Sequence, residues 1–209
     1  MFFVFYLAID FISYFCNSVN ELFNMKNSSP LFYNSLIAGL ITSAILVLYS
    51  SLLYIFKVDS FNLFVMMMTF VFQLTVLILG MVFGVLHYRN KYCGGFIDYK
   101  NAFISCLLIG INAAIVVSLF TFVLYKFIAP ELLQDYIDHT IEMLQKYPTI
   151  PEDKLTQIYN EVSKQTPESI LMGSVVQLSI GSGILSLIIA AFAKKEKGVF
   201  DDEDTNNII

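Results

Sequence analysis

The chain has 209 residues, of which 57% are hydrophobic and only 14% are charged, and its mean hydropathy is +0.70. Soluble domains carry about 25% charged residues, so this composition excludes an ordinary water-soluble protein and indicates one surrounded by lipid. The net charge of -5 provides no basic face for nucleic acid, and the three cysteines are too dispersed for a disulfide framework.

The first residues of the chain precede any convincing membrane span. Residues 1–16 are apolar but short, contain Asp10, and lack the basic start of a secretory signal peptide. Met25 begins a more conventional start, because a lysine and several polar residues follow it directly. We interpret residues 1–29 as an N-terminal extension, with translation expected to begin at Met25. The alternative is a genuine interfacial helix or a fifth span.

Four later segments are long and apolar enough to cross a bilayer. A spanning helix needs about 20 apolar residues, because the hydrocarbon core is about 30 Å thick and a helix rises about 1.5 Å per residue. Apart from Lys126, these segments contain no charged residue. The predicted spans are residues 32–56, 61–86, 102–128 and 170–193. We predict an all-α membrane protein with a four-helix transmembrane bundle over residues 30–196.

The stretch between the last two spans, residues 129–168, has the pattern of two amphipathic helices. Apolar residues recur at helical spacing after Pro130, whose missing N–H is harmless in a first helical turn, and Pro148 ends this helix. Residues 149–152 match a capping box that starts the second helix. We predict an extracytoplasmic helical hairpin here. The tail 197–209 is acidic and is expected to be disordered.

Lysine and arginine are unequally distributed over the two ends of this bundle. The end without the hairpin receives seven basic residues, Lys26, Arg89, Lys91, Lys100, Lys194, Lys195 and Lys197. The other end receives five, in a much longer stretch that also holds eight acids. The positive-inside rule therefore places both termini and the loop 87–101 in the cytoplasm, and residues 129–168 outside.

The predicted spans contain no Asp, Glu, Arg or His at membrane depth. Intramembrane ionisable groups mark proton relays, ion paths and substrate sites, so their absence argues against a coupled transporter or a haem protein. Three amides do lie at mid-depth, Gln73, Asn112 and Gln177. We expect them to form hydrogen bonds between helices, with a polar ligand site or pore lining as the alternative.

Two further clusters have a structural and a functional interpretation. The last span carries a stripe of small residues, Ser179, Gly183, Ser186 and Ala190, with Gly181 and Ser182 beside it. We expect this stripe to pack within the bundle, and a homo-oligomer seam is the alternative. Four polar residues share one face of the hairpin, Asp135, Asp138, His139 and Glu142. We interpret them as a solvated face rather than a divalent-ion site.

The loop after the second span has clear local structure signals. Gly94 and Gly95 predict a tight turn, and Asp98 is well placed as the N-cap of the third span. Thr166 and Pro167 have the same relation to the last span, as N-cap and first helical residue. The arginine and lysines of the loop can meet anionic headgroups. We predict no catalytic, cofactor-binding or metal-ligating residue in the chain.

One run of this loop resembles a known family. It reads Tyr88-Arg89-x-Lys91 … Gly94-Gly95-x-Ile97-Asp98-Tyr99-x-x-Ala102-Phe103. This resembles the hallmark of the bacterial membrane-protein family catalogued as domain of unknown function 4199. The similarity extends through residues 127–131 and the end of the last span, residues 190–195, and covers about residues 30–196. The family usually has Ser-Phe in place of Asp98-Tyr99, and serine is also a strong N-cap.

The resemblance implies four spans in a bacterial inner membrane, no assigned activity and no catalytic residues. Three functions follow as hypotheses. The first is a structural or accessory membrane component that binds a periplasmic or membrane protein partner. The second is a small passive channel or transporter component. The third, a membrane-embedded enzyme, is disfavoured by the lack of any acid, base, nucleophile or metal set in the spans.

Overall fold

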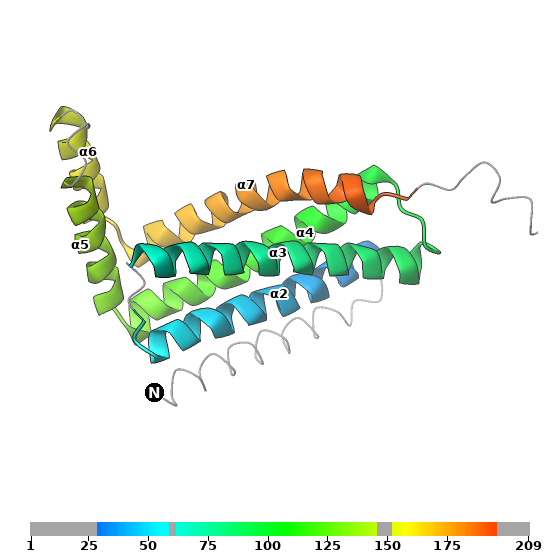
Figure 1. Cartoon of the computed structure of the whole chain (residues 1–209), viewed down its shortest axis with the longest axis horizontal. Coiled ribbons are helices and arrows are strands. Elements are labelled where there is room, and N and C mark those ends of the chain that lie inside the picture. The colour runs from blue at the N-terminus through cyan, green and yellow to red at the C-terminus, as the bar shows by residue number, and fades with distance from the viewer. Residues whose placement is uncertain (1–28, 59–61, 146–151, 196–209) are drawn as a thin grey trace, which may run out of the picture.

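In the computed structural model, four long helices run side by side as a bundle and two shorter helices lie across one end (Figure 1). The structure describes residues 29–58, 62–145 and 152–195. The long helices are α2 (Pro30–Ile55), α3 (Leu63–Tyr92), α4 (Tyr99–Val123) and α7 (Pro167–Ala193). Among the described residues, four helices are long and apolar enough to cross a membrane. The predicted all-α, four-span fold is therefore confirmed.

Helix α3 is longer than the span predicted for it. The expected span ends at residue 86, whereas α3 continues to Tyr92 and reduces the connection to α4 to six residues, 93–98. The end of the apolar run marks where the chain leaves the hydrocarbon of the bilayer, whereas the helix itself continues beyond that point. The next helix-breaking residue is Gly94, so the polar residues before it stay helical.

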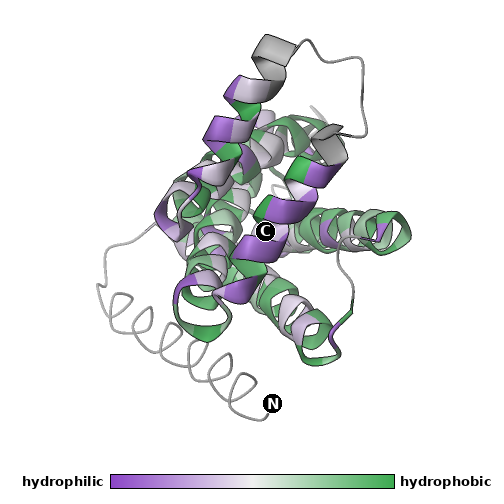
Figure 2. Cartoon of the chain, turned by 90° about the vertical axis from the view of Figure 1, so that its left-hand side faces the viewer, coloured by the Kyte–Doolittle hydropathy of each residue, from purple (hydrophilic) through white to green (hydrophobic). Residues whose placement is uncertain are grey.

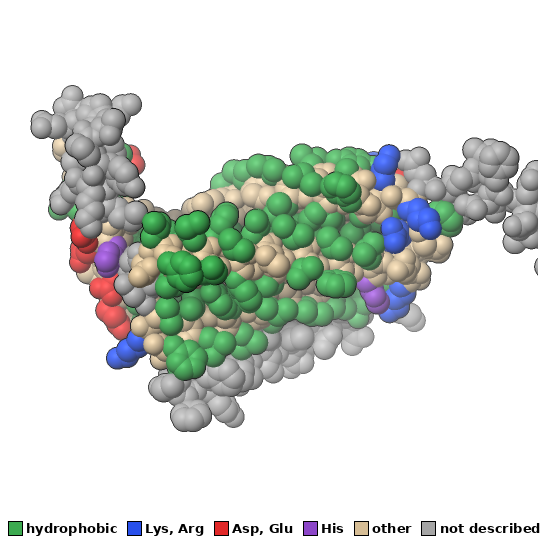
Figure 3. All heavy atoms as spheres, viewed as in Figure 1, with side chains coloured by type: hydrophobic (Ala, Val, Ile, Leu, Met, Phe, Trp, Pro, Cys, Tyr) green, Lys and Arg blue, Asp and Glu red, His purple; other side chains and the backbone are tan. Residues whose placement is uncertain are grey.

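The two ends of the bundle differ in charge. At the first, which we call the basic end, α2 begins, α3 ends, α4 begins and α7 ends. Basic side chains gather there (Figure 3), contributed by Arg89, Lys91, Lys100, Lys194 and Lys195. The sides of the bundle between the two ends are covered by hydrophobic side chains on the face that Figure 3 shows. This distribution matches a helix bundle surrounded by lipid.

Helix α4 lies at the centre of the bundle and contacts α2, α3 and α7. Small residues let these backbones approach closely. A Cβ atom added to Gly110 would lie 2.4 Å from the Cβ of Ser182 on α7. A Cβ added to Gly39 of α2 would lie 2.8 Å from the Cβ of Asn112. Both distances are too short for real atoms, so each glycine is required by the packing of α4.

The interior of the bundle is rich in small polar residues. The buried polar residues in the described part of the chain are Asn34, Ser35, Thr42, Ser43, Ser51, Ser105, Ser118, Ser182 and Ser186. Two of their hydrogen bonds join different helices: Asn34 Nδ2 donates to the Gly84 carbonyl at 2.8 Å, and the Ser35 and Ser105 hydroxyls lie 3.1 Å apart. Most of the other hydroxyls bond a carbonyl of their own helix.

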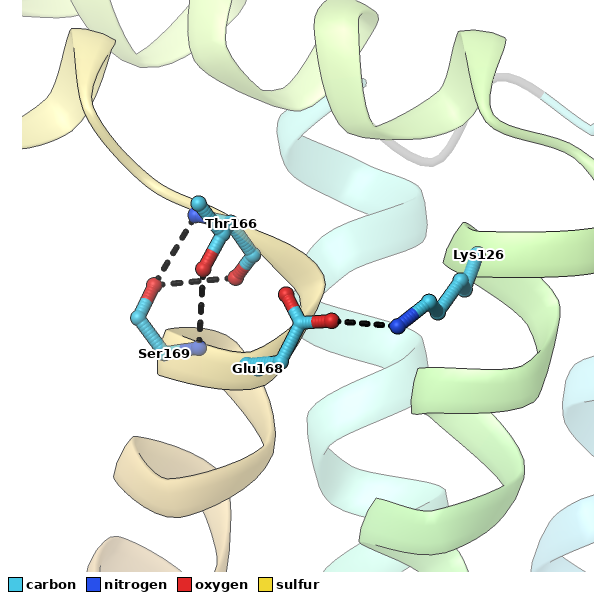
Figure 4. Close-up of polar contacts among 4 residues, drawn as sticks. All are labelled: Lys126, Thr166, Glu168 and Ser169. Carbon is cyan, nitrogen blue, oxygen red and sulfur yellow. Dashed lines mark hydrogen bonds and ion pairs between the residues drawn. The ribbon is translucent and has the colours of Figure 1, made fainter.

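At the end opposite the basic end, α4 continues as a π-helical turn, η1 (Leu124–Ile128). Lys126 of η1 forms an ion pair with Glu168 in the first turn of α7 (Figure 4). Beside it, Thr166 Oγ1 accepts from the Ser169 N–H at 3.3 Å, and Ser169 Oγ accepts from the Thr166 N–H at 3.0 Å. The predicted Thr166 N-cap is confirmed, with Pro167 as the first helical residue.

Helices α5 (Glu131–Gln145) and α6 (Glu152–Ser163) lie side by side across this end (Figure 2). Ile137 of α5 and Val162 of α6 are both only 7% exposed, so each helix buries part of its apolar stripe. The two predicted amphipathic helices are thus present. Pro148 and the capping box at 149–152 fall in the connection between them, which lies largely outside the described residues, so the hairpin turn stays a prediction. The expected Met25 start and disordered tail lie outside them too.

The close approach of α4 and α7 gives a direct test of this packing. We expect Gly110→Ala to lower the free energy of unfolding by about 1–3 kcal/mol, because the added methyl overpacks the contact with Ser182. The measurement is unfolding of the purified protein in detergent micelles, followed by circular dichroism. Gly181→Ala is the matched control, since a Cβ there meets no atom within 4 Å. Equal stability of the two variants would contradict the packing.

Candidate functional site at the basic end

The connection between α3 and α4 begins with the predicted glycine turn. Gly94 and Gly95 have φ angles of +60° and +88°, a left-handed conformation that favours glycine. The turn caps the end of α3, because the Gly95 and Cys93 N–H groups donate to the Arg89 carbonyl at 2.9 and 3.3 Å. The chain then reverses toward the end of α7.

Three hydrogen bonds join this connection and the end of α3 to the end of α7. The Ile97 N–H donates to the Lys195 carbonyl at 2.8 Å, and the Lys195 N–H donates to the Ile97 carbonyl at 2.9 Å. Arg89 Nη1 also donates to the Ala193 carbonyl at 3.1 Å. We call Arg89, Ile97, Ala193 and Lys195 the clasp. It satisfies backbone groups at the end of α7 that a helix terminus leaves without partners.

Ile97 of the clasp packs in the hydrophobic core, and the residue that follows it is the N-cap of α4. Ile97 is 3% exposed and belongs to the same buried cluster as Ala102, Cys106 and Ala190. The next residue, Asp98, caps α4: its carboxylate accepts from the Asn101 N–H at 3.4 Å and from the Asn101 side-chain amide at 2.6 Å. The predicted N-cap is therefore confirmed, and the clasp fixes three helix ends to one another.

Around the clasp the surface is basic. Lys91, Lys100 and Lys195 are exposed, and none forms an ion pair with a residue that the structure describes. Two of them lie over aromatic rings, with Lys91 Nζ 5.4 Å from the centre of the Tyr92 ring and Lys195 Nζ 5.4 Å from that of Phe96. Positive charge without acidic partners at the end of a membrane bundle is suited to anionic headgroups.

A groove of about 570 Å³ runs between α2 and α3 toward this basic surface. The floor lies where two glycines of α3 meet α2, and exposed apolar side chains form the walls. The residues used below are Ile37, Ile41, Gly80, Phe83 and Gly84 along the groove, with His87 and Lys91 at the basic end. The sequence analysis did not identify this groove, although a glycine pair four residues apart is a signal for close helix approach.

The three mid-depth amides do not form the predicted interhelical hydrogen bonds. Gln73 and Gln177 are exposed and Asn112 is half-buried, and none has a side-chain hydrogen bond to the described part of the chain. The prediction was wrong because the interior is lined by shorter side chains. Asn34 and the Ser35–Ser105 pair make these bonds instead. The serines of α2 at positions 35, 43 and 51 recur every eight residues, which could have indicated a buried face.

The small-residue stripe of α7 packs inside the bundle in part, since Gly181 is exposed and Ser179 is half-buried. Ser182, Ser186 and Ala190 are buried, and Ser182 faces Gly110 of α4. Gly183 is less constrained, since an added Cβ would lie 3.9 Å from the nearest atom, on Leu107. A homo-oligomer through the last span stays a prediction, and it would have to use the exposed side of α7.

The polar face of α5 is not arranged as a metal site in the part of the chain that the structure describes. His139 Nδ1 lies 3.7 Å from Glu142 Oε2, and Gln134 Nε2 donates to Asp138 Oδ1 at 3.0 Å. No group of three or more metal-ligating residues is brought together among the described residues. Asp135, Asp138 and Glu142 are exposed, which fits the predicted solvated face.

The clasp can be tested by cross-linking. Ile97 and Lys195 exchange both backbone hydrogen bonds, an arrangement that places Cα atoms about 5.5 Å apart, within the range of a disulfide. With the native cysteines replaced, we expect Ile97→Cys combined with Lys195→Cys to oxidise readily within one chain, measured by loss of thiol labelling. Lys57→Cys with Lys195→Cys, at opposite ends of the bundle, should stay reduced. Equal labelling of both pairs would refute the clasp.

Comparisons with known proteins agree with the resemblance noted in the sequence. A family model described as a protein of unknown function, DUF4199, matches residues 34–195. No curated protein and no solved structure matches the chain. The matched region runs from the first turns of α2 to Lys195, so it includes nearly all of the four long helices and every residue of the clasp. The chain belongs to the DUF4199 family, whose function is unknown.

Proposed function

We propose that this protein is an accessory component of a membrane assembly and that it binds a partner protein through the outer surface of α5 and α6. It is neither an enzyme nor a channel in this proposal. The observation that carries it is the contrast between a closed bundle interior and an acidic, exposed surface on the helix pair. The orientation expected from the positive-inside rule places this surface outside the cytoplasm.

The interior of the bundle argues against a conducting path. Along α4, apolar residues such as Ile109, Val116 and Phe120 are buried together with Ser105 and Ser118, and these side chains fill the centre of the bundle. The buried polar residues within the described ranges are neutral, and most of their hydroxyls bond carbonyls of their own helix. The groove of about 570 Å³ opens on the outside of the bundle, between α2 and α3. A pore needs a continuous polar lining, which this arrangement does not offer.

The surface of α5 and α6 has the features of a protein-binding surface. Ile137 and Val162 are turned inward, whereas acidic residues are exposed at Glu131, Asp135, Asp138, Glu142 and Glu161. Two tyrosines lie among these acids, Tyr136 at 38% and Tyr159 at 49% exposure. Exposed tyrosines are enriched in protein interfaces, and an acidic field favours a partner with a basic surface.

The proposed interface predicts site-specific cross-links in cells. A photoreactive phenylalanine analogue at position 136 or 159 should give one recurrent protein adduct, identified by mass spectrometry. The same analogue at Phe192, which is 86% exposed at the basic end, is the positional control and should not give that adduct. Asp135→Lys with Asp138→Lys should reduce the adduct at least fivefold while the protein remains in the membrane. Adducts with lipid alone would argue against a partner.

The channel alternative predicts a different result in vesicles. We expect liposomes containing the purified protein to release ions and small neutral solutes no faster than protein-free liposomes, because the bundle centre is filled. The measurement is dye and ion flux at matched protein-to-lipid ratios. Flux that disappears in Asn112→Leu, a half-buried position, and persists in Gln177→Leu, an exposed one, would favour a channel and overturn the proposal.

A further inference from the structure

The groove between α2 and α3 has a shape and a charge distribution that point to a lipid. We propose that it binds one acyl chain of an anionic phospholipid, with the lipid phosphate at Lys91 and His87. This site is separate from the surface of α5 and α6, which lies at the opposite end of the bundle (Figure 1).

The floor of the groove is closed by direct contact between the two helices. A Cβ atom on Gly80 would lie 2.0 Å from Thr42 Oγ1, and one on Gly84 would lie 2.8 Å from the Cβ of Ala38. The missing side chains of α3 thus leave a trough above a sealed floor. Its walls are apolar and exposed, with Ile41 at 59% and Phe83 at 67% exposure. A flexible hydrocarbon chain can fill such a trough without leaving a polar group unpaired.

The length of the groove matches one leaflet of a bilayer. Val76 and Lys91 both line it and lie 15 residues apart on α3, which corresponds to about 22 Å along the helix. Half of the hydrocarbon core is about 15 Å thick and the headgroup layer of one side adds about 5–7 Å. A chain that starts near Val76 therefore reaches His87 at the edge of the hydrocarbon, and Lys91 lies one turn beyond, at headgroup level.

The charge at the basic end selects an anionic headgroup. His87 and Lys91 are exposed, and no Asp or Glu is among the residues that line the groove. Lys91 forms no ion pair with a described residue and leans over the Tyr92 ring, at 5.4 Å from the ring centre. Lysine at a membrane surface attracts acidic lipid strongly enough to produce a preference of about fivefold.

The protein supplies a convenient optical test, because the chain contains no tryptophan. Ile41→Trp places a single fluorophore on the wall of the groove. Ile180→Trp places one at 61% exposure on α7, outside the groove, as the matched control. Each variant is reconstituted in two kinds of phosphatidylcholine vesicle. One kind contains a fraction of phosphatidylglycerol with brominated acyl chains, and the other contains the same fraction of phosphatidylcholine with brominated acyl chains. Quenching reports which lipid occupies the neighbourhood of the tryptophan.

We expect brominated phosphatidylglycerol to quench Trp at position 41 with about fivefold higher relative affinity than brominated phosphatidylcholine, and to show no such preference at position 180. In the Ile41→Trp variant, Lys91→Gln should abolish the preference, whereas Lys91→Arg, which keeps the positive charge, should retain it. Lys100→Gln removes the same charge at the same end, outside the groove, and should leave the preference unchanged.

Two results would overturn the proposal. Equal quenching by both lipids at position 41 would show that the groove does not select anionic headgroups. Weaker quenching at position 41 than at position 180 by both lipids would show that another occupant, such as residues 1–28 of the chain or a second copy, excludes lipid from the groove. Circular dichroism and gel filtration of each variant establish that the bundle is intact in every comparison.

Discussion

The architecture depends on how closely α4 approaches its neighbours. In lipid, helices gain little from burying apolar surface, because the lipid tails outside are as apolar as the side chains that would be buried. Attraction must come from dispersion between closely spaced backbones and from a few hydrogen bonds. Gly39, Gly110 and the buried serines provide that spacing, since none has a side chain large enough to hold two helices apart. Replacing this packing with larger apolar residues would remove the contacts that place α4 at the centre.

Close packing also explains why the bundle needs fastening at its ends. The contacts between small residues fix the distance between helices along their length, but they do not satisfy the backbone groups at the helix ends. At the basic end the clasp joins α3, α4 and α7 through Arg89, Ile97 and Lys195. At the opposite end the ion pair between Lys126 and Glu168 joins η1 to α7. That pair is exposed and contributes little to stability by itself.

Much of this fold could be predicted from the sequence, because hydropathy and local chemistry are sufficient for it. The four spans follow from runs of apolar residues, and Asp98, Thr166 and the glycine turn follow from short-range hydrogen-bonding rules. The partners of polar groups across helices could not be predicted in this way. Asn34 bonds the carbonyl of Gly84, a residue whose missing side chain lets α2 approach α3 closely, and predicting this bond requires the rotation of both helices to be known.

The candidate site lay beyond sequence analysis for the same reason. A single pair of bridged residues, Ile97 and Lys195, has no periodicity, and two whole spans together with α5 and α6 lie between its members in the chain. The groove likewise arises only when α2 and α3 are placed together. The pair Gly80 and Gly84 indicates a close approach by another helix, but it does not show which helix approaches or that a groove forms.

The distribution of polarity constrains where this protein can act. Its described interior is filled and uncharged, which supports the proposal that binding occurs on the surface. The charged surface is concentrated at the two ends, basic around the clasp and acidic on α5 and α6. An acidic surface near a membrane is repelled by anionic headgroups, whereas the basic end is attracted to them. In the proposed orientation, the same charge separation would direct α5 and α6 away from lipid, toward water, where the proposed partner protein would bind.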